Sequence, residues 1–92
     1  SAYTYLEDDG KTLLSLGRFN EYRIALEGGA CTVTKVHGGY TPQTGGRLFT
    51  LRLPEGMRFS RHGEPTLSFD PDSLELNLPL RVCYEGTIPQ HT

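Results

Sequence analysis

The longest alternating segment of this 92-residue chain reads Leu74-Glu75-Leu76-Asn77-Leu78-Pro79-Leu80-Arg81-Val82-Cys83-Tyr84. Every even position in it is apolar or aromatic, and polar residues stand among the odd positions. Successive side chains of a strand point to opposite faces, so the even residues form one apolar stripe. The pattern predicts a half-buried β-strand. Pro79 lacks the N–H that a sheet ladder needs, so it predicts either an edge position or a break into two shorter strands.

The segments before this strand predict further short strands separated by turns. Residues 2–6 and 11–16 flank Asp8-Asp9-Gly10, which favours a β-hairpin, with a short helix over 11–16 as the alternative. Residues 21–26 and 31–37 alternate in the same way around Gly28-Gly29 and predict an antiparallel hairpin. Strands are also expected at 47–53, 57–60 and 66–69, and the tail from residue 85 is expected to fray.

Size and composition favour one β-rich domain over residues 1–92. Eleven glycines and six prolines lie between the short apolar runs, as is typical of many tight turns. We therefore expect a mainly β fold, a small antiparallel sheet or sandwich of about eight short strands. The net charge of −2 gives no basic excess for nucleic acid. No apolar run approaches the roughly 20 residues of a membrane span. The chain begins with Ser1 and without a visible signal peptide, so we expect it to be processed or part of a longer chain.

The two cysteines, Cys31 and Cys83, lie 52 positions apart in two predicted strands. A disulfide between them is expected if the protein is exported, and closing a loop of that length would stabilise the fold by about 4 kcal/mol. The alternative is a pair of buried free thiols in a cytosolic protein.

Two stretches resemble the globular domain of type IV pilin-like proteins and minor pseudopilins. They read Leu53-Pro54-Glu55-Gly56-Met57-Arg58-Phe59 and Leu67-Ser68-Phe69-Asp70-Pro71-Asp72. The resemblance covers about residues 18–78, with Ser73 where the family pattern has glycine and without the family's long apolar N-terminal helix. It implies a non-enzymatic, exported subunit of a pilus or secretion pseudopilus that assembles with other subunits. Such domains often carry a disulfide, which would fit Cys31 and Cys83.

Two loops hold candidate binding residues. The loop from Gly38 to Gly46 has a glycine pair at each end, and Tyr40 and Pro42 in its middle could form a contact surface. A phosphate cradle there would need a lysine and a following helix, which the sequence lacks. Asp70 and Asp72 are a weak calcium candidate, because two carboxylates fall short of six to eight ligands; an ordinary turn is the alternative.

Arg58, Arg61 and His62 form a local basic cluster, which Arg47 or Arg52 could join. Such a cluster could contact DNA phosphates, with solvated arginines as the alternative. The histidines share no spacing that predicts a metal site, and no motif places a nucleophile beside a base. We therefore predict no enzyme, no metal and no cofactor.

Tyrosines complete the candidate surfaces. Tyr3 and Tyr5 share one face of the first strand, whereas Tyr22 and Tyr84 continue apolar stripes and are expected in the core. The sequence thus predicts an extracytoplasmic structural or assembly subunit, in the periplasm, at the cell surface or secreted. Its partners would be other pilus or secretion-system subunits, with DNA as a further possibility. The alternative is a free-standing β-sandwich that binds a glycan, peptide or protein through the Gly38 to Gly46 loop.

Overall fold

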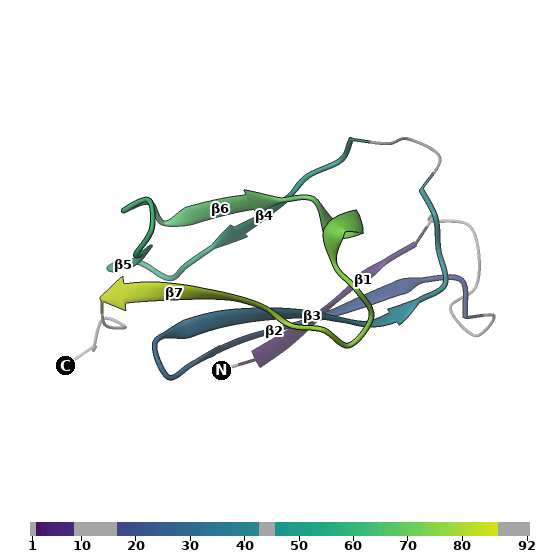
Figure 1. The fold of residues 1–92 in the computed structure, drawn as a ribbon, viewed down its shortest axis with the longest axis horizontal. Coiled ribbons are helices and arrows are strands. Elements are labelled where there is room, and N and C mark those ends of the chain that lie inside the picture. Colours follow the sequence, from purple (N-terminus) through teal and green to yellow (C-terminus); the bar gives the residue numbers. More distant parts are fainter. Residues whose placement is uncertain (1, 9–16, 43–45, 87–92) are drawn as a thin grey trace.

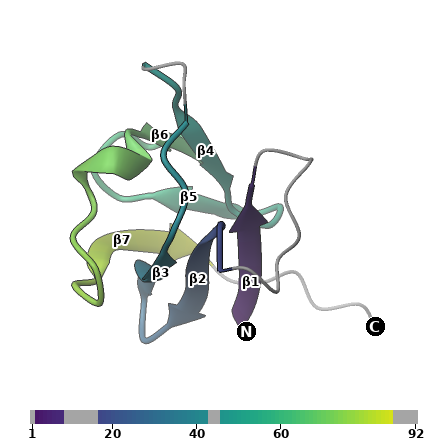
Figure 2. The ribbon, with the colours of Figure 1, turned by 90° about the vertical axis from the view of Figure 1, so that its right-hand side faces the viewer.

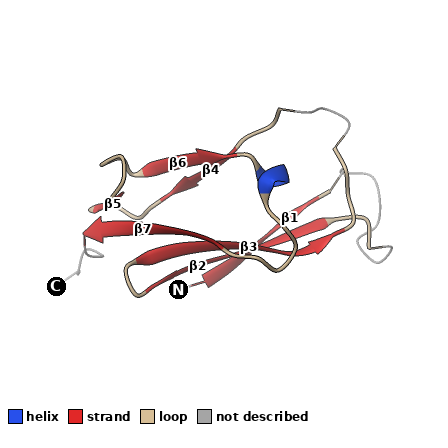
Figure 3. Ribbon diagram, in the orientation of Figure 1, coloured by secondary structure: helices blue, strands red, loops and turns tan. Residues whose placement is uncertain are grey.

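The regular secondary structure of the described residues consists of β-strands and one short 3-10 turn. The structure is a computed structural model that describes residues 2–8, 17–42 and 46–86. These residues form seven strands and one 3-10 turn (Figure 3): β1 Ala2–Glu7, β2 Asn20–Glu27, β3 Ala30–Gly38, β4 Phe49–Arg52, β5 Met57–Phe59, β6 Thr66–Phe69, the turn η2 Pro71–Ser73, and β7 Leu80–Gly86. All strand pairs are antiparallel. The predicted mainly β fold is therefore confirmed.

The strands form two layers of unequal width. A five-stranded sheet has the order β1-β2-β3-β7-β5, and a second sheet contains only β4 and β6. Figure 1 shows β4 and β6 lying over the larger sheet, and the view along the molecule in Figure 2 shows β1 at the margin of that sheet. The two-stranded layer is too narrow to cover all of the larger sheet.

The hydrophobic core lies between the two layers. Alternation along β2 and β3 turns Tyr22, Ile24, Cys31 and Val33 inward, since a strand sends every second side chain to one face. Leu51 of β4 and Leu53 just after it meet them from the second layer. Met57 and Phe59 of β5, at the far edge of the larger sheet, complete the core, and Phe59 is fully buried. Tyr84 packs half-buried against this core, so the predicted core positions of Tyr22 and Tyr84 are confirmed.

The predicted hairpin around Gly28-Gly29 is confirmed as β2 and β3. Both glycines adopt positive φ, +61° and +78°. Two successive residues with positive φ give a turn whose twist matches the right-handed twist of the flanking strands. Glycine fits this turn because it lacks a Cβ atom.

The long alternating segment is only partly a strand. β7 begins at Leu80, and its inward residues Leu80, Val82 and Tyr84 are half-buried as the alternation predicts. Before it, Asn77 has a φ of +62° and turns the chain, and Pro79 cannot donate to a ladder. Leu76 and Leu78 are consequently 56% and 57% exposed. The segment does break before β7, but into a turn and one strand where two shorter strands were predicted. The edge interpretation was wrong because β7 lies between β3 and β5.

The two ends of the chain add pairings that the sequence did not predict. β1 pairs with β2, with Tyr3 opposite Ile24 and Tyr5 opposite Tyr22. Residues 11–16, the predicted second arm or short helix, lie outside the described residues. Glu85 and Gly86 pair with Arg58 and Met57, so this start of the tail is not frayed, and residues 87–92 lie outside the described part.

The predicted disulfide between Cys31 and Cys83 is not formed. Both cysteines are free thiols, Cys31 buried and Cys83 exposed. Cys31 stands opposite Val82, and Cys83 stands opposite Ala30. Directly opposite residues share a face, so the one-residue offset places the two sulfurs on opposite faces of the sheet. Burial raises the pKa of the Cys31 thiol.

Thiol accessibility tests this arrangement. We expect one thiol per native chain to react rapidly with a chromogenic disulfide reagent, and two thiols to react after denaturation. Cys83→Ser should remove the rapid phase, because the remaining thiol is buried and its raised pKa disfavours the reactive thiolate. A chain with no reactive thiol even in denaturant, until a reductant is added, would show that the two cysteines are bonded.

Candidate aromatic binding cleft

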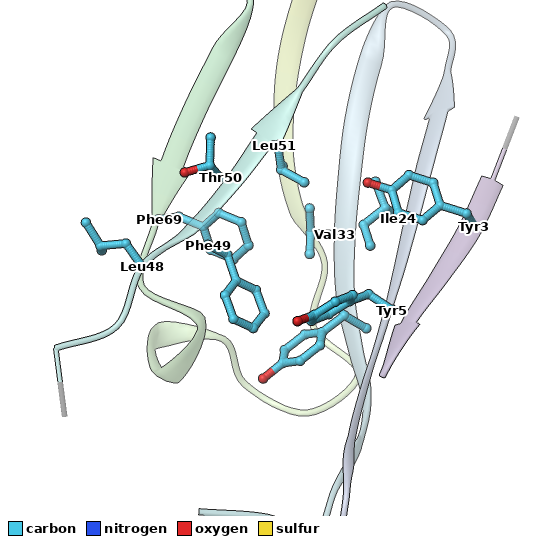
Figure 4. Close-up of a pocket in the computed structure, with 10 residues that line it drawn as sticks. Tyr3, Tyr5, Ile24, Val33, Leu48, Phe49, Thr50, Leu51 and Phe69 are labelled. Atoms are coloured by element: carbon cyan, nitrogen blue, oxygen red, sulfur yellow. The ribbon is translucent and has the colours of Figure 1, made fainter. Parts of the chain in front are cut away.

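A cleft opens between the margin of the larger sheet and strand β4. It encloses about 320 Å³, and we call it the aromatic cleft (Figure 4). This volume lies at the lower end of the range of ligand pockets. Its lining consists of Tyr3, Tyr5, Tyr22, Ile24, Val33, Leu48, Phe49, Thr50, Leu51 and Phe69.

Alternation and sheet width together expose the tyrosines of β1. Tyr3 and Tyr5 stand opposite Ile24 and Tyr22, so they point to the same face as these inward residues. No strand of the described second layer pairs with β4 on the side of β1, and the tyrosines remain 60% and 48% exposed. Leu48, across the cleft, is 64% exposed. The cleft is thus an uncovered part of the sandwich interior.

Phe49 is the central ring of the cleft wall. Its ring centroid lies 5.1 Å from that of Tyr22, 5.4 Å from Tyr5 and 5.8 Å from Phe69, each pair in an edge-to-face arrangement. This geometry brings the positive edge of one ring to the negative face of another, and it fixes the orientation of the rings. Figure 4 shows Tyr3 and Tyr5 projecting from β1 towards Phe49 on β4. The walls are therefore held by ring packing across both layers.

A carboxylate at the end of β1 joins the two walls. Glu7 Oε1 accepts hydrogen bonds from Asn20 Nδ2 at 2.9 Å, Tyr22 Oη at 3.1 Å and Arg47 Nη2 at 2.9 Å. Glu7 Oε2 accepts a further bond from Arg47 Nε at 2.7 Å. The Arg47 guanidinium thus binds Glu7 with two parallel hydrogen bonds, the strongest common form of this ion pair.

The same network extends to three further segments. Asn20 is 1% exposed, and its amide binds the backbone of Gly39 and Tyr40 through three hydrogen bonds. Arg47 Nη1 donates to Asp72 Oδ2 at 2.8 Å, and the guanidinium lies 5.6 Å from the ring centroid of Phe49. We call Glu7, Asn20, Tyr22, Arg47 and Asp72 the Glu7 network.

Burial and hydrogen bonding shift the pKa values within this network. Burial by itself raises the pKa of Glu7, but the hydrogen bonds from Arg47, Asn20 and Tyr22 outweigh it and hold the pKa below the ordinary 4.5. Burial and the Glu7 charge raise the pKa of Tyr22 to about 12. The hydrogen bonds to Glu7 raise the pKa of Arg47. Near neutral pH, Glu7 and Arg47 are therefore both charged and Tyr22 keeps its proton.

Of the candidate residues predicted from the sequence, Tyr40 contacts the Glu7 network through its backbone, and the basic cluster lies elsewhere. The backbone of Tyr40 binds Asn20, and Pro42 follows two residues later in the same loop. Arg58 pairs with Glu85 at 3.5 Å, and Arg61 and His62 lie in the exposed turn after β5. Arg52 and Arg58 both line a second hollow beside Pro54, whereas Arg47 belongs to the Glu7 network.

The weak calcium candidates are engaged in internal contacts. Asp70 Oδ1 accepts a hydrogen bond from the Asp72 backbone N–H at 2.8 Å and caps η2, while the Asp72 carboxylate binds Arg47.

The histidines do not form a metal site in the described part of the chain. The His37 ring stacks on Phe19 with 4.2 Å between the ring centroids, and His37 Nε2 lies 3.0 Å from the Gly17 carbonyl oxygen. Within the described ranges, no three His, Cys, Asp or Glu side chains are grouped to hold a metal ion. His91 lies outside these ranges.

Sequence patterns did not identify Glu7, Asn20 or Arg47. Arg47 lies 40 residues from Glu7, and no spacing rule links them. The shared face of Tyr3 and Tyr5 was the available indication of the cleft, and the register of β1 with β2 confirms that they share a face.

Comparison with protein-family models, curated proteins and solved structures finds no match. In residues 2–8, 17–42 and 46–86, no helix has the length and apolar character to cross a membrane.

Replacing Glu7 tests the importance of the network. We expect Glu7→Gln to lower the free energy of unfolding at pH 7 by about 2 kcal/mol, because it removes the largely buried charge that pairs with Arg47 and leaves only the more exposed Asp72 as a charged partner. Asp72→Asn is the matched control. It removes an Arg47 contact on a side chain that is 55% exposed, and should cost less than about 1 kcal/mol.

The acid side of the stability profile supplies a second measurement. Because the pKa of folded Glu7 is depressed, its stabilisation is present above the ordinary value of 4.5 and is lost as pH falls through the folded pKa. Denaturant unfolding from pH 7 to pH 2 should therefore show a steeper acid decline for the wild type than for Glu7→Gln. Parallel curves for the two proteins would contradict the assigned role.

Proposed function

We propose that this chain is a non-enzymatic binding domain that takes an apolar segment of a partner protein into the aromatic cleft. The observation that carries the proposal is the exposure of Tyr3, Tyr5 and Leu48 around an apolar floor. Large exposed aromatic surface costs free energy in water, and burying it against a partner recovers that energy. Covering the cleft with an apolar segment would therefore be favourable.

The chemistry of the lining supports a protein partner. The lining side chains are aliphatic, aromatic or hydroxyl-bearing, and tyrosine and phenylalanine are enriched in the buried centres of protein interfaces. The walls are fixed in advance by the ring contacts of Phe49 and by the Glu7 network. A preformed site loses little conformational entropy on binding, which favours affinity.

The resemblance of residues 18–78 to pilin-like domains suggests which partners these are. We extend the proposal to an assembly role, in which the partners are other subunits of a type IV pilus or secretion pseudopilus outside the cytoplasm. A cleft that accepts part of a neighbouring subunit is consistent with such a role. Cys31 and Cys83 are free thiols, so the disulfide that is common in such domains does not support this proposal.

The intact mass of the native protein, isolated from its source, tests the assembly role. We expect a chain longer than these 92 residues, with an apolar N-terminal helix as the resemblance implies. A native chain of these 92 residues alone would contradict the pilin-like proposal while leaving the cleft proposal standing.

Peptide selection tests the cleft itself. Random peptides displayed on phage would be selected on the immobilised protein, and the selected peptides mapped on it by NMR. We expect shifts centred on Tyr3, Tyr5 and Leu48, and binding weakened about tenfold by Leu48→Ser through loss of apolar contact. Leu78→Ser is the matched control, because Leu78 is similarly exposed but does not line the cleft. Shifts centred on Tyr40 and Pro42 would instead favour binding through the Gly38 to Gly46 loop.

A further inference from the structure

Within the part of the chain that the structure describes, strand β1 presents an open edge beside the aromatic cleft. Among the described strands β1 pairs with β2 alone and ends the sheet. The backbone N–H and C=O groups on its outer side therefore have no strand partner in the described part of the chain. Such a row of groups is a template for another strand.

This edge lacks the features that usually protect an edge strand. β1 reads Ala-Tyr-Thr-Tyr-Leu-Glu, which contains no lysine and no proline, and its register with β2 runs without a shift over six residues. Lysine, proline and bulges are the common devices that prevent strand addition. β4, which forms the opposite wall, likewise pairs with β6 alone among the described strands.

The charges around the edge indicate what kind of strand fits it. Ala2 to Leu6 carry no charge, and the Glu7 charge that follows is compensated by the two hydrogen bonds from Arg47. An uncharged segment therefore complements this edge, whereas a charged side chain entering the cleft would lose its hydration without gaining a partner. The occupant that matches is an uncharged strand with apolar side chains at every second position.

The polar groups of the cleft argue against a glycan. Tyr22 Oη already donates to Glu7, and the Thr50 and Ser68 hydroxyls lie 3.1 Å apart in a hydrogen bond with each other. A sugar needs several side-chain donors and acceptors to replace its hydration, and two of the four hydroxyls that line the cleft are already engaged. The open backbone edge supplies hydrogen bonds at the spacing of a polypeptide strand instead.

We infer that an extended, uncharged segment of a partner protein adds to the outer edge of β1 as a further strand. Its alternate side chains enter the aromatic cleft beside Tyr3, Tyr5 and Leu48, and its backbone binds the open edge. This inference rests on the proposed function and specifies the conformation and chemistry of the bound partner. Main-chain hydrogen bonds supply affinity, and the spacing of the cleft selects the side chains.

Backbone methylation of a synthetic peptide tests the inference. The parent is a short blocked peptide in which valine and threonine alternate. In a strand, valine and threonine N–H groups point to opposite edges, so N-methylating only the valines or only the threonines blocks one edge and spares the other. We expect the parent to bind in fluorescence anisotropy. One methylated peptide should keep this affinity, and the other should bind at least about tenfold more weakly, as losing one or two hydrogen bonds implies.

Protein variants separate this inference from the proposed function. Binding of the parent should weaken in Leu48→Ser and persist in Leu78→Ser. If both methylated peptides bind like the parent and Leu48→Ser still weakens them, the cleft binds but strand addition is wrong. If neither the parent nor any phage-selected peptide binds at the cleft, the proposed function fails as well. A dimer of the protein alone that Leu48→Ser dissociates would identify a second copy as the occupant and overturn the inferred partner.

Discussion

The carboxylate of Glu7 is the interaction on which the arrangement of this domain depends. It accepts four hydrogen bonds, and its partners come from β2 and from the segment that enters β4. Asn20 and Arg47 extend the contacts to the loop after β3 and to η2. A largely buried charge is tolerated only when its partners are in place, because desolvation otherwise costs several kcal/mol. These five segments must therefore assemble together.

The unequal width of the two layers leaves an apolar cleft beside this network. A sheet of five strands faces a sheet of two, so the inner face of β1 extends beyond its cover. The Glu7 network fixes one end of this uncovered region by joining β1 to the residues before Phe49. Phe49 then orients the rings of Tyr5, Tyr22 and Phe69. The result is a preformed apolar cleft beside an edge of β1 that no other described strand covers.

A binding role is consistent with this combination of rigidity and exposure. The Glu7 network and the ring contacts of Phe49 hold the walls of the cleft in place. A partner that bound there would therefore meet a surface that is already ordered. Near neutral pH Glu7 stays charged and Tyr22 stays protonated, since the pKa of Glu7 is lowered and that of Tyr22 is raised to about 12. Their chemistry is that of a structural support for the cleft.

The sequence by itself determined the features that depend on neighbouring residues. Alternation identified the inward faces of β2, β3 and β7, and Gly28-Gly29 identified the hairpin, because side-chain direction and turn conformation are local properties. Tertiary structure alone decided that β1 pairs with β2, that Cys31 and Cys83 face opposite sides, and that Arg47 reaches Glu7. Each of these depends on the register between strands distant in sequence. A one-residue offset reverses every face, and residue patterns within a single strand do not encode it.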